Sequence, residues 1–461
     1  MGRLNPRHAV PVRRGLSPST AIPAPNEPSF LDFRNLLVWP AYVLLFLMLV
    51  FPMVVQLLYV KTFLFAFLII LVGISVWTTD RTPLHPTVAL WTLFLITVGA
   101  LFALRGMFLG APGALKAAQV YVLWPLVYAV LISGVTQKRI LIGLQRTIVV
   151  ATLCIAVQGG VYLLTQAGVL PENRYAELLS FDWESQGIGF HEGYVGMQYP
   201  GVNSLPFLVP FLFASLLTLS PDNKSGPVSR TWVGVSFFSG LAMVLASGRR
   251  ALLLVTFMAP LLSFALLLFD PSQTWRLSMR SFFRAVAFLA VSIVILVLLM
   301  NTIYKVNLSA LFDRFSEGFD FRATTFDEGA GARHEQYLAL IRGWFENPLL
   351  GAGHGASAYG SIRSETMPWA YELSYVALLF QTGLLGFLAY SAGVIWICWT
   401  GIKMIREGRA LGKVMLPAMV GMTCFLVATA TNPYLARFDG LWVLFLPLAV
   451  INFGLCHFSA D

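Results

Sequence analysis

Long, nearly uncharged apolar runs recur along this chain, and they constrain its fold more than any other feature. Each approaches the roughly 20 residues that an α-helix needs to cross a hydrocarbon core of about 30 Å. The composition agrees, because 57% of the residues are hydrophobic and only 11% are charged, far from the averages of soluble domains. The sequence predicts an all-α polytopic membrane protein with about twelve transmembrane helices, centred on residues 41–51, 63–76, 88–104, 120–133, 148–164, 205–219, 232–246, 252–269, 285–300, 373–399, 414–430 and 441–455.

The division between the first two helices is the least defined of all. Pro52 and Lys61 favour a tight turn outside the membrane, whereas a single kinked segment over residues 36–77 is the alternative. The alternative would reverse the orientation of every later helix.

Lys and Arg gather in alternate short connections, which predicts the orientation of the chain. Such residues accumulate on the cytoplasmic side, and the pattern therefore favours both termini in the cytoplasm. The basic residues assigned to this side are Arg3, Arg7, Arg13, Arg14, Arg34, Lys138, Arg139, Arg146, Lys224, Arg230, Arg276, Arg280, Arg284, Lys403, Arg406, Arg409 and Lys413.

Four regions follow from this pattern. Residues 1–35 combine Arg with Pro and Ser and lack an apolar core segment, so a disordered cytoplasmic tail is expected rather than a cleavable signal. Residues 36–303 hold the first nine helices, with an outer loop over 167–203. Residues 304–370 form a large outer loop between the ninth and tenth helices, and residues 371–461 hold the last three. The net charge of +9 indicates topology and contact with membrane lipid, and it implies no nucleic-acid partner.

Cysteine and histidine provide no metal or redox signal. All four cysteines lie in or beside apolar helices, where they behave as small hydrophobic residues, and the histidines are scattered. The glycines of GAGHG lack the Lys-Ser/Thr ending of an ATP-binding loop. We therefore expect no metal site, no cofactor and no ATP-driven mechanism.

The first outer loop is rich in acids and aromatic rings. This mixture suits a sugar, whose hydroxyls form hydrogen bonds while its C–H faces stack on rings. A lid that only packs against the bundle explains the composition equally well. The residues concerned are Glu172, Arg174, Glu177, Asp182, Trp183, Glu184, His191, Glu192, Tyr194 and Tyr199.

The second outer loop contains the run RHEQYLALIRGWFENPLLGAGHG. Helical spacing of Arg333, Tyr337 and Ile341 predicts a short amphipathic helix on the membrane, which Asn-Pro would end. The three glycines that follow permit a positive φ or a close approach to a ligand, and a tight turn is the simpler interpretation.

Charged groups also stand at the membrane boundary, where they are costly and indicate a site. The run SGRRALLL places Arg249 and Arg250 at a helix end, where adjacent arginines point in different directions. Snorkelling to headgroups explains one of them, whereas a turn that directs a guanidinium into the protein explains the pair. A guanidinium matches phosphate oxygens in a bidentate manner. Arg333 and Glu372 bound the second outer loop in a similar way.

The order of SGRRALLL, the long loop with Arg333, NPLLGAGHG and then ELSYVALLFQTGLLG resembles the O-antigen polymerase and O-antigen ligase (Wzy-type) family of bacterial envelope glycosyltransferases. The resemblance covers residues 232–453. It implies a GT-C-like fold in the bacterial inner membrane with a periplasmic active site. It also implies transfer of a glycan from a polyprenyl diphosphate carrier to a sugar hydroxyl, without a metal and with inversion, and a chain-length regulator as a possible partner protein.

The resemblance also implies roles for individual residues. Arg249 or Arg250, together with Arg333, would bind the diphosphate, and Glu372 falls where the ligases have a histidine, so it becomes the candidate base. This departure favours a polymerase over a ligase, and a lipid-linked oligosaccharide flippase is the alternative from another class. The remaining expected substrate-binding residues are His354, Tyr375, Arg342 and Arg437. His354 is also an alternative to Glu372 as the base, although a glycine-rich turn more often carries a polar residue for solvation, and Arg437 is equally a partner of Asp439 in the run TNPYLARFDG.

Overall fold

The computed structural model describes residues 38–52, 54–77, 84–135, 137–171, 187–191, 194–219, 228–271, 275–304, 309–310, 312–313, 328–360, 365–407 and 411–458. The predicted tail lies outside these residues, and so do all the acids of the first outer loop, which are Glu172, Glu177, Asp182, Glu184 and Glu192.

Each predicted apolar segment corresponds to a helix. These helices are α2 (Val38–Val50), α3 (Leu58–Trp77), α4 (Pro86–Phe108), α6 (Trp124–Ser133), α7 (Lys138–Gln166), α9 (Leu205–Thr218), α10 (Arg230–Ser247), α11 (Arg250–Leu267), α12 (Trp275–Tyr304), α15 (Ser374–Arg406), α16 (Gly412–Thr429) and α17 (Trp442–Phe458). The short α5 (Ala114–Ala118) and the π-helical turn η2 (Gln119–Leu123) lead directly into α6.

The helical membrane class is confirmed. Ten helical segments in the described residues are long and apolar enough to span a bilayer, whereas α2 and α17 are shorter apolar helices. The predicted number of twelve spans therefore stays a prediction.

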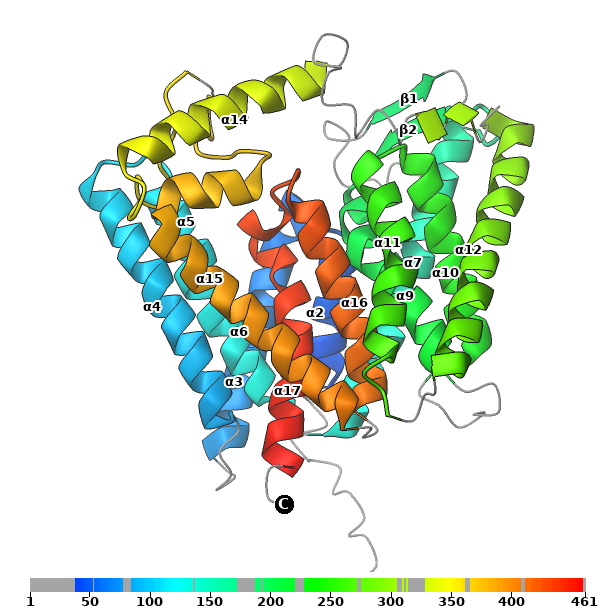
Figure 1. The fold of residues 1–461 in the computed structure, drawn as a ribbon, viewed down its shortest axis with the longest axis horizontal. Coiled ribbons are helices and arrows are strands. Elements are labelled where there is room, and N and C mark those ends of the chain that lie inside the picture. Colours follow the sequence, from blue (N-terminus) through cyan, green and yellow to red (C-terminus); the bar gives the residue numbers. More distant parts are fainter. Residues whose placement is uncertain are drawn as a thin grey trace, which may run out of the picture.

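The bundle has two distinct ends (Figure 1). One end carries helix α14 (Glu328–Glu346), which lies across the bundle, and an antiparallel hairpin of β1 (Gly187–His191) and β2 (Tyr194–Gln198), in which Gly187 pairs with Gln198. We call it the α14 end. Helix α17 ends at the opposite end, where the basic residues Lys138, Arg230 and Arg406 begin or end their helices. These basic helix ends agree with the predicted orientation, and the side of the membrane stays a prediction.

The first two apolar segments form separate helices, as the turn prediction required. Helix α2 ends at Val50 and the short turn η1 (Val55–Leu57) precedes α3. Lys61, however, does not lie in an exposed turn. Its side chain is only 1% exposed and contacts Asp439, because a cation in an apolar helix needs a partner inside the protein.

Helix α15 is interrupted at Gly383, which has a φ of 62°. A break of this kind leaves backbone groups without their helical partners, and they must be satisfied inside the protein. The segment after α14 supplies them. The amides of Ala352 and Gly353 donate to the carbonyls of Phe380 and Gln381, and the amides of Leu384 and Leu385 donate to those of Pro348 and Leu349, all at 2.8–3.1 Å. The NPLLGAGHG and QTGLLG runs therefore form one interlocked unit.

The glycines of NPLLGAGHG serve this packing. Gly351, Gly353 and Gly355 all have a positive φ, and a Cβ added at Gly353 would lie 2.5 Å from the backbone of Gly106. A Cβ at Gly355 would lie 2.1 Å from the backbone of Gly113. These glycines meet neighbouring backbone rather than an open space, which supports the tight-turn interpretation.

Candidate functional site

Helix α14 contacts the start of α15 through one face. Gln336 and Leu340 on this face are buried, and Gly343 packs so closely on Phe380 that a Cβ would lie 2.6 Å from the ring. Of the predicted stripe, Tyr337 is 45% exposed and does not belong to this buried face. The face that packs on α15 is therefore rotated by about one residue from the stripe, and the placing of the stripe on the membrane stays a prediction.

Arg333 lies on the same face and forms an ion pair with Glu372. Its Nε atom donates to Oε2 of Glu372 at 2.7 Å, and the two side chains are 37% and 23% exposed. The backbone amide of Glu372 donates to Oε1 of Gln336 at 3.1 Å. Two residues of α14, one turn apart, therefore fix both the side chain and the backbone of Glu372.

Glu372 stands just before α15, whose positive dipole end favours a carboxylate. The Oγ atom of Ser374, the first residue of α15, donates to the carbonyl of Asn432 at 3.1 Å. Asn432 belongs to the connection between α16 and α17, residues 430–441, which includes the short turns η5 (Tyr434–Ala436) and η6 (Phe438–Gly440). We call it the 430–441 connection. It therefore lies directly beside Glu372 and its helix.

Arg249 reaches the same region from another part of the bundle. Helix α10 ends at Ser247, and the capping residue Gly248 adopts a left-handed conformation with a φ of 59°, which allows the chain to turn directly into α11. Nη1 of Arg249 donates to Oδ1 of Asn203 at 2.8 Å, in the turn η3 (Pro200–Ser204) that precedes α9. This confirms that the turn directs a guanidinium into the protein. Arg250, the first residue of α11, is half-buried.

Tyr434 is hydrogen-bonded to Arg249, and the charge of Arg333 also acts on it. Burial raises the pKa of its phenol, while a hydrogen bond with Arg249 and the charges of Arg249 and Arg333 act in the opposite direction. Both guanidinium groups are therefore close enough to affect one hydroxyl group. Arg249, Arg333, Glu372 and Tyr434 come from four separate segments, and we call them the arginine cluster.

The cluster combines two permanent positive charges with one carboxylate. Guanidinium groups hold their charge at any physiological pH and present N–H donors in a fork that fits phosphate oxygens. A carboxylate within reach of a bound hydroxyl can accept its proton. The arrangement is therefore suited to an anionic ligand that is processed next to an alcohol.

The remaining predicted residues are distributed around this site. Arg437 is exposed on the 430–441 connection, and Arg342 is exposed farther along α14. The hydroxyl of Tyr375 donates to the carbonyl of Leu426 at 2.6 Å and ties α15 to α16. Of the aromatic residues in the first outer loop, Tyr199 is buried and its hydroxyl donates to Gln158 of α7, which gives it a packing role.

His354 lies in a separate, fully buried environment. Its Nε2 is 2.9 Å from the hydroxyl of Tyr390, its Nδ1 is 3.4 Å from Oε1 of Gln381, and its ring stacks on Tyr121 with 4.0 Å between centroids. Burial lowers the pKa of His354 to about 4, so the ring is neutral at pH 7. A neutral, enclosed imidazole cannot contribute charge to an anion site, and we leave it out of the cluster. Nor does it serve as a solvated turn residue.

Sequence reasoning missed three polar partners. Asn203 and Gln336 orient Arg249 and Glu372, and Lys61 pairs with Asp439. Gln336 follows Arg333 by three residues, which puts the two on one helical face, and this spacing was available in the sequence. The solitary Lys61 in an otherwise apolar helix was a comparable signal. No such pattern identifies Asn203.

No family model matches the chain, and no curated protein matches it at a significant level. The likeness to Wzy-type enzymes therefore rests on the order of the motifs and on their chemistry.

Proposed function

We propose that the chain is a membrane glycosyltransferase that polymerises lipid-linked oligosaccharide repeat units. It would transfer a glycan from a polyprenyl diphosphate carrier to a sugar hydroxyl. The arginine cluster carries the proposal: Arg249 is hydrogen-bonded to Tyr434, the charge of Arg333 also acts on that phenol, and Nε of Arg333 lies 2.7 Å from Oε2 of Glu372. The order of motifs that resembles the Wzy-type family supports the same chemistry.

The proposed reaction follows from the groups in the cluster. The arginines hold the diphosphate and stabilise the charge that develops on it as it leaves. The acceptor hydroxyl attacks the anomeric carbon, its proton passes to Glu372, and the bond from carbon to the phosphate oxygen breaks with its electrons on the diphosphate. Attack on the face opposite the leaving group inverts the anomeric centre. No cofactor takes part in this scheme.

The place of the cluster supports a reaction at the membrane surface. It lies at the α14 end, away from the basic helix ends of α7, α10 and α15. If the basic end is cytoplasmic, the cluster faces the periplasm of the inner membrane. There the polyprenyl tail of the donor stays in the bilayer while its diphosphate reaches headgroup level.

Charges gathered at one end favour a transferase over a flippase, because a transporter carries polar groups near the midplane along a route across the bilayer. Ligase activity differs from polymerase activity only in its acceptor.

The deciding experiment is to incubate the purified chain with a synthetic polyprenyl diphosphate repeat unit. A ladder of products supports a polymerase, transfer to lipid A core alone indicates a ligase, and movement across vesicles without transfer indicates a flippase.

A further inference from the structure

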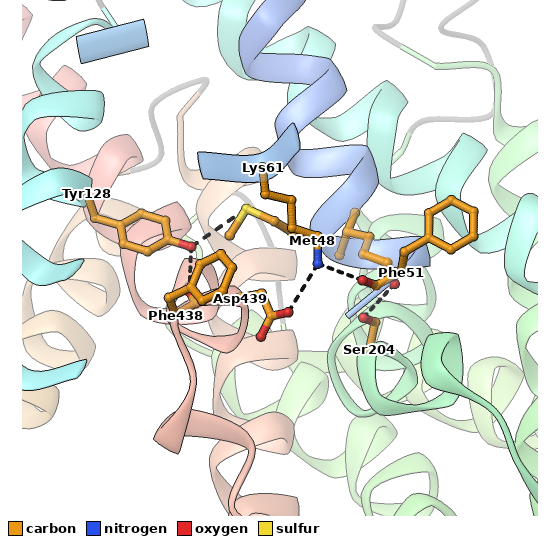
Figure 2. A network of polar contacts seen from close by, with 8 residues as sticks. Met48, Phe51, Lys61, Tyr128, Ser204, Phe438 and Asp439 are labelled. Atoms are coloured by element: carbon orange, nitrogen blue, oxygen red, sulfur yellow. Dashed lines mark hydrogen bonds and ion pairs between the residues drawn. The ribbon is translucent and has the colours of Figure 1, made fainter. Parts of the chain in front are cut away.

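Helix α2 ends inside the protein, and two side chains complete its last turn (Figure 2). The carbonyl of Leu49 accepts a hydrogen bond from Oγ of Ser204 at 2.7 Å, and the carbonyl of Phe51 accepts one from Nζ of Lys61 at 2.6 Å. The final carbonyls of any helix lack partners within the helix. The cation of Lys61 is also favoured here by the negative end of the helix dipole.

The same ammonium group pairs with Asp439 on the 430–441 connection. The Nζ and Oδ2 atoms are 3.2 Å apart, and the side chains are 1% and 5% exposed. Two charges removed from water cost several kcal/mol each, and their attraction often does no more than offset that cost. The pair therefore contributes little net stability, and we look for its role in the geometry that it fixes.

The contacts around the pair hold the 430–441 connection against the bundle. The carbonyl of Phe438 accepts a hydrogen bond from the hydroxyl of Tyr128 at 2.8 Å. The ring of Phe438 stacks on Trp124 with 4.6 Å between centroids, and Nζ of Lys61 lies 5.8 Å from the centre of the Phe438 ring. Lys61 therefore contacts two adjacent residues of the connection, at the segment where it enters α17.

The other half of the connection forms part of the arginine cluster. Tyr434 contacts Arg249 there, and the carbonyl of Asn432 accepts from Ser374. The two halves are closely packed on each other, because a Cβ added at Gly440 would lie 2.2 Å from the carbonyl oxygen of Tyr434. Movement of Gly440, which follows Asp439 directly, would therefore press on the backbone of Tyr434.

We propose that Lys61 and Asp439 are positioning residues, which hold the 430–441 connection so that Tyr434 meets Arg249 in the anion site. The two residues do not touch the ligand. The identity of the ligand as a diphosphate rests on the proposed function, whereas the positioning itself does not.

The first test measures hydrogen–deuterium exchange of the full-length purified chain without any ligand. The double variant Lys61→Met with Asp439→Leu removes both charges at similar side-chain volume, and such replacements often preserve stability. We expect amide exchange over the 430–441 connection to rise roughly tenfold or more, because the fixing contact is lost. Exchange at the wild-type rate would overturn the proposal.

Two further variants control this measurement. Ser236→Ala removes a buried polar contact elsewhere, between α10 and α7, where the hydroxyl donates to the carbonyl of Val149, and it should leave exchange in the connection unchanged. Asp439→Asn keeps an acceptor for Lys61 but removes the charge, and it covers the case in which the double variant does not accumulate. For Asp439→Asn we expect a smaller rise in exchange over the same residues. The absence of any rise would count against the positioning role.

The second test measures binding of inorganic pyrophosphate in a mutant cycle with Arg249→Lys. Distant sites normally contribute independently, whereas coupled sites do not. We expect the double variant to lower affinity roughly tenfold, and Arg249→Lys to add clearly less in that background than alone. Unchanged affinity or full additivity would overturn the proposal. If exchange rises but the wild-type chain does not bind pyrophosphate, the diphosphate assignment fails while the positioning role stands.

Discussion

Arg333 and Glu372 hold each other across the junction of α14 and α15, with Nε of the arginine 2.7 Å from Oε2 of the glutamate. In the proposed reaction each has a different partner, the diphosphate for Arg333 and the acceptor hydroxyl for Glu372. Both groups are partly exposed, so a ligand can reach them. An anion that binds Arg333 competes with Glu372, and the carboxylate becomes available when the donor occupies the site.

The first prediction concerns Glu372→Gln. Loss of a general base lowers the rate by about 10²- to 10⁴-fold, so single-turnover elongation of the lipid-linked repeat should nearly stop. Pyrophosphate should bind more tightly, because glutamine cannot neutralise Arg333. Glu346→Gln, at the exposed end of α14, is the matched control and should change neither measurement. Turnover within a few-fold of wild type would place the base elsewhere.

The second prediction concerns Arg333→Lys. Lysine keeps the charge but cannot reproduce the guanidinium fork, so transfer should fall by about a hundredfold, as expected for a contact that stabilises the leaving group. Arg342→Lys makes the same change at an exposed position of the same helix and should have little effect. Equal activity of the two variants would remove Arg333 from the site.

The third prediction concerns the interlocked NPLLGAGHG and QTGLLG runs. Gly353→Ala introduces a Cβ where φ is 89° and the backbone of Gly106 lies 2.5 Å away, so both strain and overlap oppose it. The unfolding temperature in detergent should fall by several degrees. Gly160→Ala, at a position in α7 where a Cβ meets nothing within 4 Å, should leave that temperature unchanged or raise it. Wild-type stability of Gly353→Ala would show that the runs do not depend on this close approach.

The fourth prediction concerns pH. Burial lowers the pKa of His354 from 6.5 to about 4, so the unfolded chain binds a proton there more readily than the folded chain. The stability that this site contributes is complete above about pH 6.5 and is lost as the pH falls towards 4. The unfolding temperature should therefore fall between pH 7 and pH 4.5, and His354→Gln should reduce that dependence. An identical pH dependence of the unfolding temperature in the variant would contradict the lowered pKa of His354.

Much of the fold could be predicted from hydropathy, because a bilayer imposes length and apolarity on each helix. The turn at residues 248–249 and the break around residues 345–350 could also be predicted, since Gly and Asn-Pro act locally. The interruption of α15 at Gly383 could not, because its cause is the backbone of residues 348–353, far away in the sequence.

The site was predictable only in part, for the same physical reason. Arginines and a glutamate at a membrane boundary stand out as costly groups, so Arg249, Arg333 and Glu372 were identified. Only the packing of segments that lie far apart in the sequence brings Arg249 to Tyr434 and Arg333 to Glu372. His354 looked like a polar residue in a glycine turn, and only the three-dimensional structure places Tyr121 and Tyr390 around it.

The fifth prediction concerns the side of the membrane on which the cluster lies. Tyr359 is fully exposed at 100% in the segment between α14 and α15, and the basic helix ends predict that this segment is periplasmic. In a variant without the four native cysteines, Tyr359→Cys should react with a membrane-impermeant maleimide in intact cells whose outer membrane is permeable. A cysteine at Glu407, which follows α15 at the basic end, should react only after the inner membrane is opened. The reverse pattern would put the cluster in the cytoplasm, where the proposed polymerisation does not take place, and would therefore count against the proposed function as well as the topology.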